Sequence, residues 1–494
     1  MTETDIAIVG SGFSGLGMAI KLKEEGIEDF VVLERDPQVG GTWWANTYPG
    51  CGCDVPSHLY SFSFAPNPDW TRTYSKQPEI EGYLQRVAED FGVLPHVRLG
   101  TTVAGAAWDA DASRWTLETD RGDVSARVLV SAAGALSEPS TPHIPGMDSF
   151  EGHAFHSARW DHDYDLKGKK VAVIGTGASA IQFVPAIAPD VAQVHVFQRT
   201  APWIMPHSDR PISARERRLY RRFPILQKLV RGGVYTGREL LVLGFVKQPK
   251  LMKVVERLAR KHMDRQISDP VLRRKVEPGY TIGCKRILPS NEWYPALGRD
   301  NVELVTDGIA EVRERSIVTK AGDEIEADAI IFGTGFHVTD MPVANWVRGR
   351  GGRTLRDSWE GSPQAYLGTA APGFPNMFML LGPNTGLGHS SMVYMAESQI
   401  AHVIEALRRI RGRGADVFEV RPEVVKRYNA SIDERMRDTV WSTGCTSWYL
   451  DDTGRNSTLW PDWTFRFRRR AARFDPAEYE LSNAPAPAHD PAPA

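Results

Sequence analysis

Two glycine-rich stretches have the residue types and spacing that bind dinucleotides. The first reads G-x-G-x-x-G, with glycines at Gly10, Gly12 and Gly15. It lies between an apolar run expected to form a strand and a stretch expected to form a helix. The glycines allow a tight turn and bring a pyrophosphate close to the helix N-terminus. Glu34 ends the next apolar run, 24 residues after Gly10, where a carboxylate binds a ribose hydroxyl.

The second stretch differs from the first at the residue that would read the ribose. It is a G-x-G-x-x-A motif that includes Gly175, Gly177 and Ser179. Arg199 follows 24 residues after Gly175, at the offset where the first motif has its carboxylate, and Thr200 comes next. An arginine there suits a 2'-phosphate, which favours NADP over NAD. The alternative is that Arg199 is a solvated charge at the end of a strand.

A third stretch, residues 40–54, reads G-G-x-W-x-x-x-x-Y-P-G-x-x-x-D. The paired glycines Gly40 and Gly41 would let the backbone approach a flavin, Thr42 follows them in the same turn, and Trp43 could cover an aromatic face. The stretch ends at Asp54. The alternative is a Gly/Pro-rich loop with a capping aspartate.

A fourth stretch lies between the two glycine motifs, in the position of a linker. It reads F-x-G-x-x-x-H-x-x-x-W-D, with its fixed positions at Phe150, Gly152, His156, Trp160 and Asp161. Simple packing of its aromatic residues, with the histidine bound to a backbone carbonyl, is the competing interpretation.

Lys285 and Arg286 are adjacent cations at the edge of an apolar segment. Such groups are costly to bury without anionic partners. They are therefore either a surface pair or part of a site that holds negative charge.

Together these stretches resemble the type I Baeyer-Villiger monooxygenases, flavoenzymes that insert one oxygen atom of O2 beside a ketone carbonyl. The resemblance covers nearly the whole chain. It implies FAD at the first glycine motif and NADPH at the second. It also implies conversion of a small-molecule ketone to an ester or lactone through a C4a-peroxyflavin, with sulfides as an alternative substrate.

The resemblance also assigns roles to single residues. Arg286 is implied to be the active-site arginine, oriented by Asp54 beside the flavin, and Lys285 to help hold the 2'-phosphate. Asn384 falls in a loop at the flavin edge. Trp448 is implied to reach the nicotinamide cofactor, although a buried packing tryptophan is the competing view.

Two other classes of function stay open. A flavin-containing monooxygenase that oxidises nitrogen or sulfur shares both glycine motifs, but its linker usually lacks the Trp-Asp or Trp-Pro ending seen at Trp160 and Asp161. A nucleotide-sensing regulatory protein without turnover needs only the two binding motifs, and would leave Asp54 and Arg286 unexplained.

The elements expected to position these residues define an α/β protein with two Rossmann-like dinucleotide-binding domains. We expect the first part of the FAD domain at residues 1–146, the NADP domain at 147–325, the second part of the FAD domain at 326–483 and a disordered tail at 484–494. A helical insertion is expected at about 208–275. Because no clean basic amphipathic face emerges there, a solvated insertion is favoured over a membrane-surface helix.

Composition excludes several other classes. The 59 Lys and Arg against 61 Asp and Glu give a net charge of -2, which does not favour nucleic acid. The four cysteines, Cys51, Cys53, Cys284 and Cys445, are irregularly spaced and argue against a disulfide framework or a metal site. No apolar run approaches the roughly 20 residues of a membrane span. We expect a cytoplasmic protein, either a monomer or a homodimer.

Overall fold

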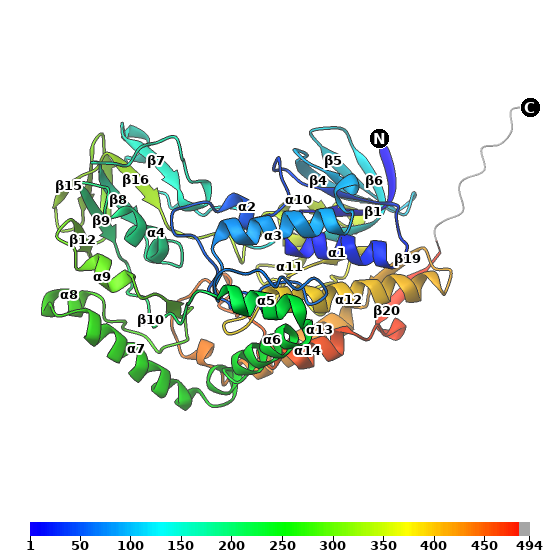
Figure 1. Ribbon diagram of the computed structural model, residues 1–494. Helices are drawn as coiled ribbons and strands as arrows, with labels where there is room; N and C mark the ends of the chain where they lie inside the picture. The colour runs from blue at the N-terminus through cyan, green and yellow to red at the C-terminus, as the bar shows by residue number, and fades with distance from the viewer. Residues whose placement is uncertain (484–494) are drawn as a thin grey trace, which may run out of the picture.

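The computed structural model describes residues 1–483 and contains two lobes, each built around its own sheet (Figure 1). The predicted disordered tail at 484–494 lies outside the described residues. The predicted α/β fold with two separate sheets, each followed by one glycine motif and a helix, is confirmed.

The first lobe contains an eight-stranded sheet whose parallel part carries the first glycine motif. β1 (Thr2–Val9) pairs in parallel with β2 (Phe30–Leu33) and β6 (Val124–Ser131). From Ile6 to Val9 the residues of β1 are at most 8% exposed, as expected for a parallel strand covered on both faces. The other strands are β3 (Val97–Arg98), β4 (Val103–Asp109), β5 (Arg114–Thr119), β17 (Val347–Arg348) and β18 (Met377–Met379).

Helices cover one face of this sheet. α1 (Phe13–Glu24) follows the first glycine motif and packs between α3 (Gln77–Asp90) and α12 (Met392–Arg411) (Figure 1). α14 (Thr464–Ala471) packs on α12 in turn. The remaining elements of this part of the chain are α2 (Thr42–Ala45), α10 (Val343–Trp346), α11 (Leu355–Trp359), α13 (Pro422–Met436), β19 (Val417–Val420) and β20 (Tyr479–Ser482).

The second lobe contains a five-stranded parallel sheet in the order β12-β9-β8-β16-β7. Its second glycine motif joins β8 to α4 (Ala180–Ile187). An antiparallel three-stranded sheet and α9 (Trp293–Leu297) complete the lobe. The strands are β7 (His153–His156), β8 (Lys170–Ile174), β9 (Gln193–Phe197), β12 (Val302–Val305), β13 (Ile309–Arg313), β14 (Ser316–Thr319), β15 (Glu324–Glu326) and β16 (Ala329–Phe332).

The position of β16 corrects the expected boundary at residue 326. β16 pairs with β7 and β8 in the second sheet, so the chain returns to the first sheet only at β17. An apolar run followed by glycine is typical of a buried parallel strand in either sheet. Its sequence therefore predicts the strand but not the sheet that it joins.

Four helices and a π-helical turn occupy most of the expected insertion. They run along one side of the molecule and reach from one lobe to the other (Figure 1). They are α5 (Ala214–Arg222), α6 (Pro224–Glu239), η4 (Leu243–Lys247), α7 (Met252–Gln266) and α8 (Pro270–Lys275). The short strands β10 (Ile204–Met205) and β11 (Leu288–Pro289) pair where the chain enters and leaves this region.

A disulfide bond joins Cys284 to Cys445, while Cys51 and Cys53 are free and buried. The sequence argued against a disulfide framework and did not predict this single bond, because residues 161 positions apart meet only in the folded chain. In the described residues, no helix is both long and apolar enough to cross a bilayer.

Candidate active site

A cavity of about 380 Å³ opens where β1, β2 and β6 end. Both the first glycine motif and residues 40–43 line it, so two predicted stretches meet at one place. Gly41, Thr42 and Trp43 are among the lining residues. Trp43 is buried and its indole N–H donates to the hydroxyl of Tyr60, 3.1 Å away, on the same wall.

The glycine that opens each motif is required by the sheet behind it. Gly10 has φ +100°, and a Cβ there would lie 2.7 Å from the carbonyl oxygen of Ala132, at the end of β6. Gly175 has φ +108°, and its Cβ would lie 2.5 Å from the carbonyl oxygen of Gly333, which follows β16. Each glycine motif thus packs against the end of a neighbouring parallel strand, and a side chain would break that contact.

Glu34 lies at the cavity with its carboxylate fixed in place. It is 5% exposed and lines the cavity. Its Oε2 accepts hydrogen bonds from the backbone N–H and the hydroxyl of Ser11, at 2.8 and 2.6 Å, and its Oε1 accepts one from the N–H of Asp36 at 3.0 Å. Ser11 belongs to the glycine motif, so the carboxylate and the phosphate-binding turn form one unit.

Asp54 and Arg286 form an ion pair across 232 residues of sequence. The guanidinium donates from Nε to Oδ2 at 3.0 Å, and from Nη2 to Oδ1 at 2.7 Å and to Oδ2 at 2.6 Å. The Arg286 side chain is 34% exposed and the Asp54 side chain 22%. Part of the Arg286 side chain therefore remains accessible while it is bound to the carboxylate.

The pair keeps both of its groups charged. Burial alone would raise the pKa of Asp54, but the adjacent Arg286 outweighs it and lowers that pKa below its ordinary value. The charge of Asp54 in turn raises the pKa of Arg286, against the effect of burial. Burial, followed by the charges of Cys53 and Asp54, raises the pKa of Tyr60, while Arg286 acts in the opposite direction, so the pair lies within electrostatic reach of the cavity wall.

Arg238 of α6 is a third member of this site that the sequence did not indicate. Its Nη2 donates to the backbone carbonyl of Asp54 at 3.1 Å and to the hydroxyl of Tyr74 at 3.4 Å. It also contributes to the lowered pKa of Asp54. A helix of the insertion therefore contacts the loop that carries the carboxylate.

The second glycine motif lies open, with two cations nearby. Gly177, Arg199 and Thr200 are exposed, and Ser179 is partly exposed. Burial and then the charge of Arg199 lower the pKa of Lys285, so the two cations are close enough to repel. Within residues 1–483 no ion pair neutralises either of them, and the ammonium of Lys285 lies 5.0 Å from the ring centre of Tyr280.

The linker stretch packs in the second lobe. Phe150 packs beside the second sheet, a Cβ at Gly152 would lie 2.5 Å from the carbonyl oxygen of Asp328, and Trp160 contacts Phe183 of α4. His156 ends β7, and its Nδ1 accepts the N–H of Ala158 at 3.1 Å.

Asp161 accepts a hydrogen bond from His153 at 2.8 Å. These contacts place the linker against the second sheet and the helix of the second motif, and a role beyond packing stays a prediction.

Hydrogen bonds to Gln182 tie the third stretch, residues 40–54 of the first lobe, to the second lobe. The Tyr48 hydroxyl donates to Oε1 of Gln182 at 3.1 Å. Oε1 of Gln182 also accepts from the backbone N–H of Gly52 at 3.2 Å, and Nε2 of Gln182 donates to the carbonyl of Gly52 at 3.1 Å. Gln182 lies in α4, so the loop that leads to Asp54 is bound to the helix of the second glycine motif. Gln182 carries no motif signal and was missed.

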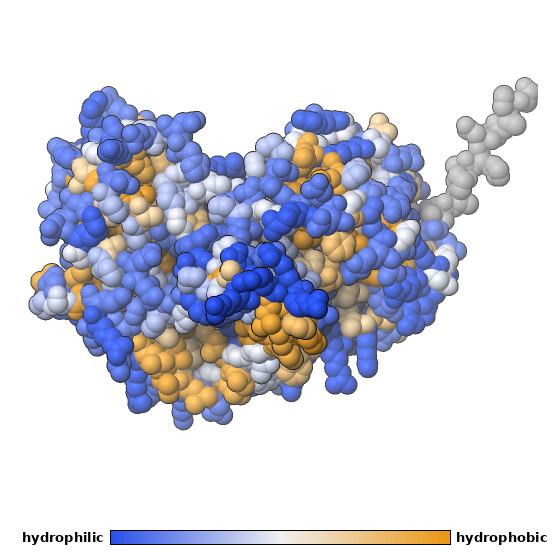
Figure 2. Space-filling model, in the orientation of Figure 1, coloured by the Kyte–Doolittle hydropathy of each residue, from blue (hydrophilic) through white to orange (hydrophobic). Residues whose placement is uncertain are grey.

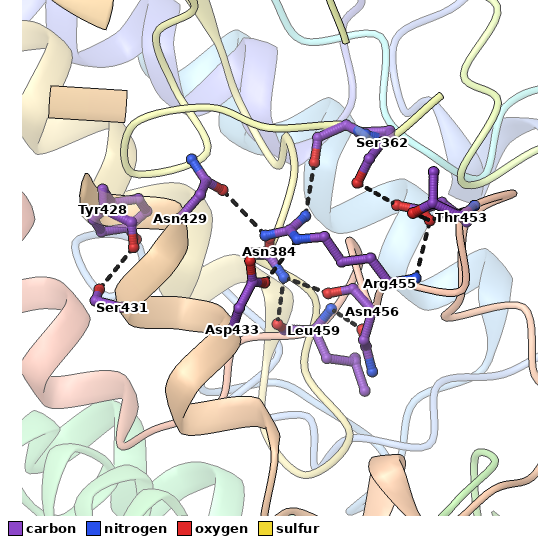
Figure 3. Close-up of polar contacts among 12 residues, drawn as sticks. Ser362, Asn384, Tyr428, Asn429, Ser431, Asp433, Thr453, Arg455, Asn456 and Leu459 are labelled. Carbon is purple, nitrogen blue, oxygen red and sulfur yellow. Dashed lines mark hydrogen bonds and ion pairs between the residues drawn. The ribbon is translucent and has the colours of Figure 1, made fainter. Parts of the chain in front are cut away.

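Asn384 lies outside the cavity, in a polar network of its own (Figure 3). Its amide donates to the carbonyls of Asn456 and Leu459, at 2.8 and 3.0 Å, and its oxygen accepts from Nη2 of Arg455 at 2.9 Å. Both hydrogens of the Asn384 side-chain amide are therefore donated, and its side-chain oxygen is already bound. The structure therefore gives Asn384 a role in fixing its loop, whereas its neighbour Leu381 lines the cavity.

Trp448 is 46% exposed and contacts Tyr449, with ring centres 4.3 Å apart. The competing view of a buried packing tryptophan is therefore wrong. The disulfide between Cys284 and Cys445 ties this loop to the segment of Lys285 and Arg286. Tyr449 contributes to the raised pKa of Arg286, which places this loop close to the ion pair.

Comparison with known proteins agrees with this geometry. Residues 7–219 match the family model of the pyridine nucleotide-disulphide oxidoreductases. A Baeyer-Villiger monooxygenase of Streptomyces coelicolor is 54% identical over 98% of this chain and 93% of its own length. One of Pseudomonas aeruginosa is 53% identical over 97% of this chain and 92% of its own.

Solved structures give the same picture. A closed cyclohexanone monooxygenase superposes with a TM-score of 0.88 at 28% identity, over 98% of this chain and all of the other. OTEMO, in a complex with FAD and NADP, superposes with a TM-score of 0.87 at 27% identity, over 97% of this chain and 99% of the other.

Proposed function

The chain belongs to the Baeyer-Villiger monooxygenases, and from this premise we propose that it uses FAD, NADPH and O2 to convert a ketone into an ester or lactone. FAD, when bound, accepts hydride from NADPH and supplies the activated oxygen. The protein's task is to hold both cofactors, to position the ketone and to stabilise negative charge while the oxygen is inserted.

The cavity in the first lobe fits FAD. Its glycine turn leaves backbone exposed to a pyrophosphate, and Glu34 is held where it can bind ribose hydroxyls. The residues near the second motif fit NADPH, because Arg199 and Lys285 repel one another and a 2'-phosphate would neutralise both.

Arg286 is the group we assign to the chemistry. Oxygen insertion needs a cation that stays charged while an oxyanion develops on the former carbonyl oxygen, and a guanidinium does so at any working pH. The Arg286 side chain is 34% exposed, which leaves room for a ligand to contact it. Asp54 is a positioning residue, because its carboxylate holds the guanidinium in one plane.

The Asp54–Arg286 pair, which lies within electrostatic reach of Tyr60 in the cavity wall, is the observation that carries the proposal. Purified protein would be given NADPH, air and a panel of ketones, with methyl phenyl sulfide as the competing substrate. Ester formed in proportion to NADPH consumed supports the proposal. Sulfoxide without any ester would instead favour a heteroatom oxygenase, and no NADPH consumption would favour a regulatory protein. A cytoplasmic location also remains a prediction, which cell fractionation can test.

A further inference from the structure

The helical insertion exposes more apolar side chains than a solvated surface requires. Eleven large apolar residues between positions 219 and 258 are between 37% and 64% exposed. Figure 2 shows hydrophobic surface gathered along the side of the molecule where α6 and α7 lie. We call these eleven residues the docking surface: Leu219, Phe223, Ile225, Leu229, Val230, Leu240, Leu241, Leu243, Leu251, Val254 and Leu258.

In α7 these side chains lie on the face opposite the one that packs on the protein. Met252, Ala259 and Met263 are buried, which fixes the inner face of the helix. Leu251, at its N-cap, and Leu258 are both 50% exposed and lie seven residues apart, so they share the outer face. The outer apolar face therefore has no partner within residues 1–483.

The same region carries a large excess of positive charge. Residues 211–266 contain fifteen Lys and Arg against four Asp and Glu, a net charge of +11, whereas the whole chain has -2. The rest of the chain therefore carries -13. Lys253 and Arg257 are exposed between the apolar residues of α7. Leucines interspersed with lysines and arginines are the composition of a helix that lies in a membrane interface.

We propose that the docking surface binds the surface of an anionic lipid bilayer. An exposed apolar face could be covered either by a second copy of this chain or by a lipid bilayer, and the charge of the region decides between the two. In a symmetric dimer each copy would bring this basic region against the same region of the other, and the cations left unpaired in the described part of the chain, such as Lys253 and Arg257, would repel. An anionic bilayer attracts these charges and accepts the leucines below its headgroups.

The sequence favoured a solvated insertion over a membrane-surface helix, because no clean basic amphipathic face was visible in it. The folded chain favours the membrane surface instead. The face becomes visible only when α6, η4 and α7 are considered together in the folded chain, because each contributes a few exposed apolar residues to it.

Flotation with lipid vesicles tests the proposal independently of catalysis. The complete protein would be mixed at about 0.1 M salt with vesicles of phosphatidylcholine alone, or of equal parts phosphatidylcholine and phosphatidylglycerol. We expect flotation with the anionic vesicles only, and its loss at high salt.

Two double variants separate the apolar contribution to vesicle binding from the electrostatic one. Leu229→Ser with Leu258→Ser should weaken binding at least tenfold, because these leucines no longer enter the bilayer. Lys253→Gln with Arg257→Gln should weaken it roughly 25-fold, because each charge contributes about fivefold.

Matched controls make the same changes away from the docking surface. Leu94 and Val271 are 40% and 50% exposed, and Lys167 and Lys320 are exposed cations. Leu94→Ser with Val271→Ser, and Lys167→Gln with Lys320→Gln, should float like the unmodified protein. Equal flotation with both kinds of vesicle, or equal losses in test and control variants, would overturn the proposal. So would a dimer in solution that the leucine variant dissociates while neither vesicle binds.

Discussion

Asp54 and Arg286 offer the most decisive prediction, because the structure says that one residue acts through the other. Replacing Arg286 with alanine removes the charge expected to stabilise the developing oxyanion, which should slow ester formation roughly 100- to 1000-fold. Asp54→Asn keeps the shape of the side chain but removes its charge and therefore the charge-assisted hydrogen bonds that it accepts from the guanidinium. Charge-assisted hydrogen bonds are worth about 1.5–3 kcal/mol, and the side chains are 34% and 22% exposed, which favours the lower end. We therefore expect a loss of about tenfold.

The double variant separates positioning from independent action. If Asp54 works only by holding Arg286, then Asp54→Asn should cost nothing further once Arg286 is alanine, and the two losses should fail to multiply. Ester formation is measured with excess ketone and NADPH. The rate of anaerobic flavin reduction by NADPH serves as the control, and it should be unchanged in all three variants.

Two results would refute this reasoning. Losses that multiply in the double variant would mean that Asp54 acts on the reaction by a route of its own. Flavin reduction that falls as far as ester formation would mean that the pair maintains the folded site and is not specific to oxygen insertion.

Three further predictions concern cofactor choice, pH and the disulfide. Arg199→Ala should weaken NADPH roughly ten- to a hundredfold while NADH binding is unchanged, and equal losses would contradict the assignment. Burial lowers the pKa of His156 and His402 to about 4, so unfolded chains bind more protons below pH 6.5. The melting temperature should therefore fall as pH drops from 6.5 towards 4, with up to about 3 kcal/mol lost per histidine. Cys445→Ser should cost about 2–4 kcal/mol of stability, and reduced wild-type protein should match it in a melting experiment.

Local patterns predicted the local parts of this structure. Glycines followed by a helix, with an acid or an arginine 24 residues on, gave the position of both turns because their geometry is set within a few residues. The strand before Gly333 was likewise predicted, but its assignment to the first lobe was wrong. A strand of four buried residues carries no information about which neighbours it will pair with.

Contacts between distant segments could not be predicted from the sequence either, because a local pattern does not indicate which distant residues a side chain will meet. The amide of Gln182 binds a loop 130 residues earlier in the chain, and nothing around Gln182 distinguishes it from a surface glutamine. The pattern around Asn384 predicted a loop, yet its side chain is occupied by Arg455, which lies 71 residues later. Residue types indicate which chemistry is available, whereas only the fold decides which groups are already paired.

The ion pair depends on how the two lobes are held together. Asp54 ends a loop whose Tyr48 and Gly52 are bound to Gln182 in the helix of the second glycine motif, and Arg286 arrives on the segment that leaves the insertion. A rotation between the lobes would act on the Gln182 bonds and on the loop of Asp54 at once. Arg238 holds the same loop from the insertion, through the carbonyl of Asp54. Because the loop is fixed from two sides, the carboxylate can aim Arg286 only while the lobes and the insertion keep their relative positions.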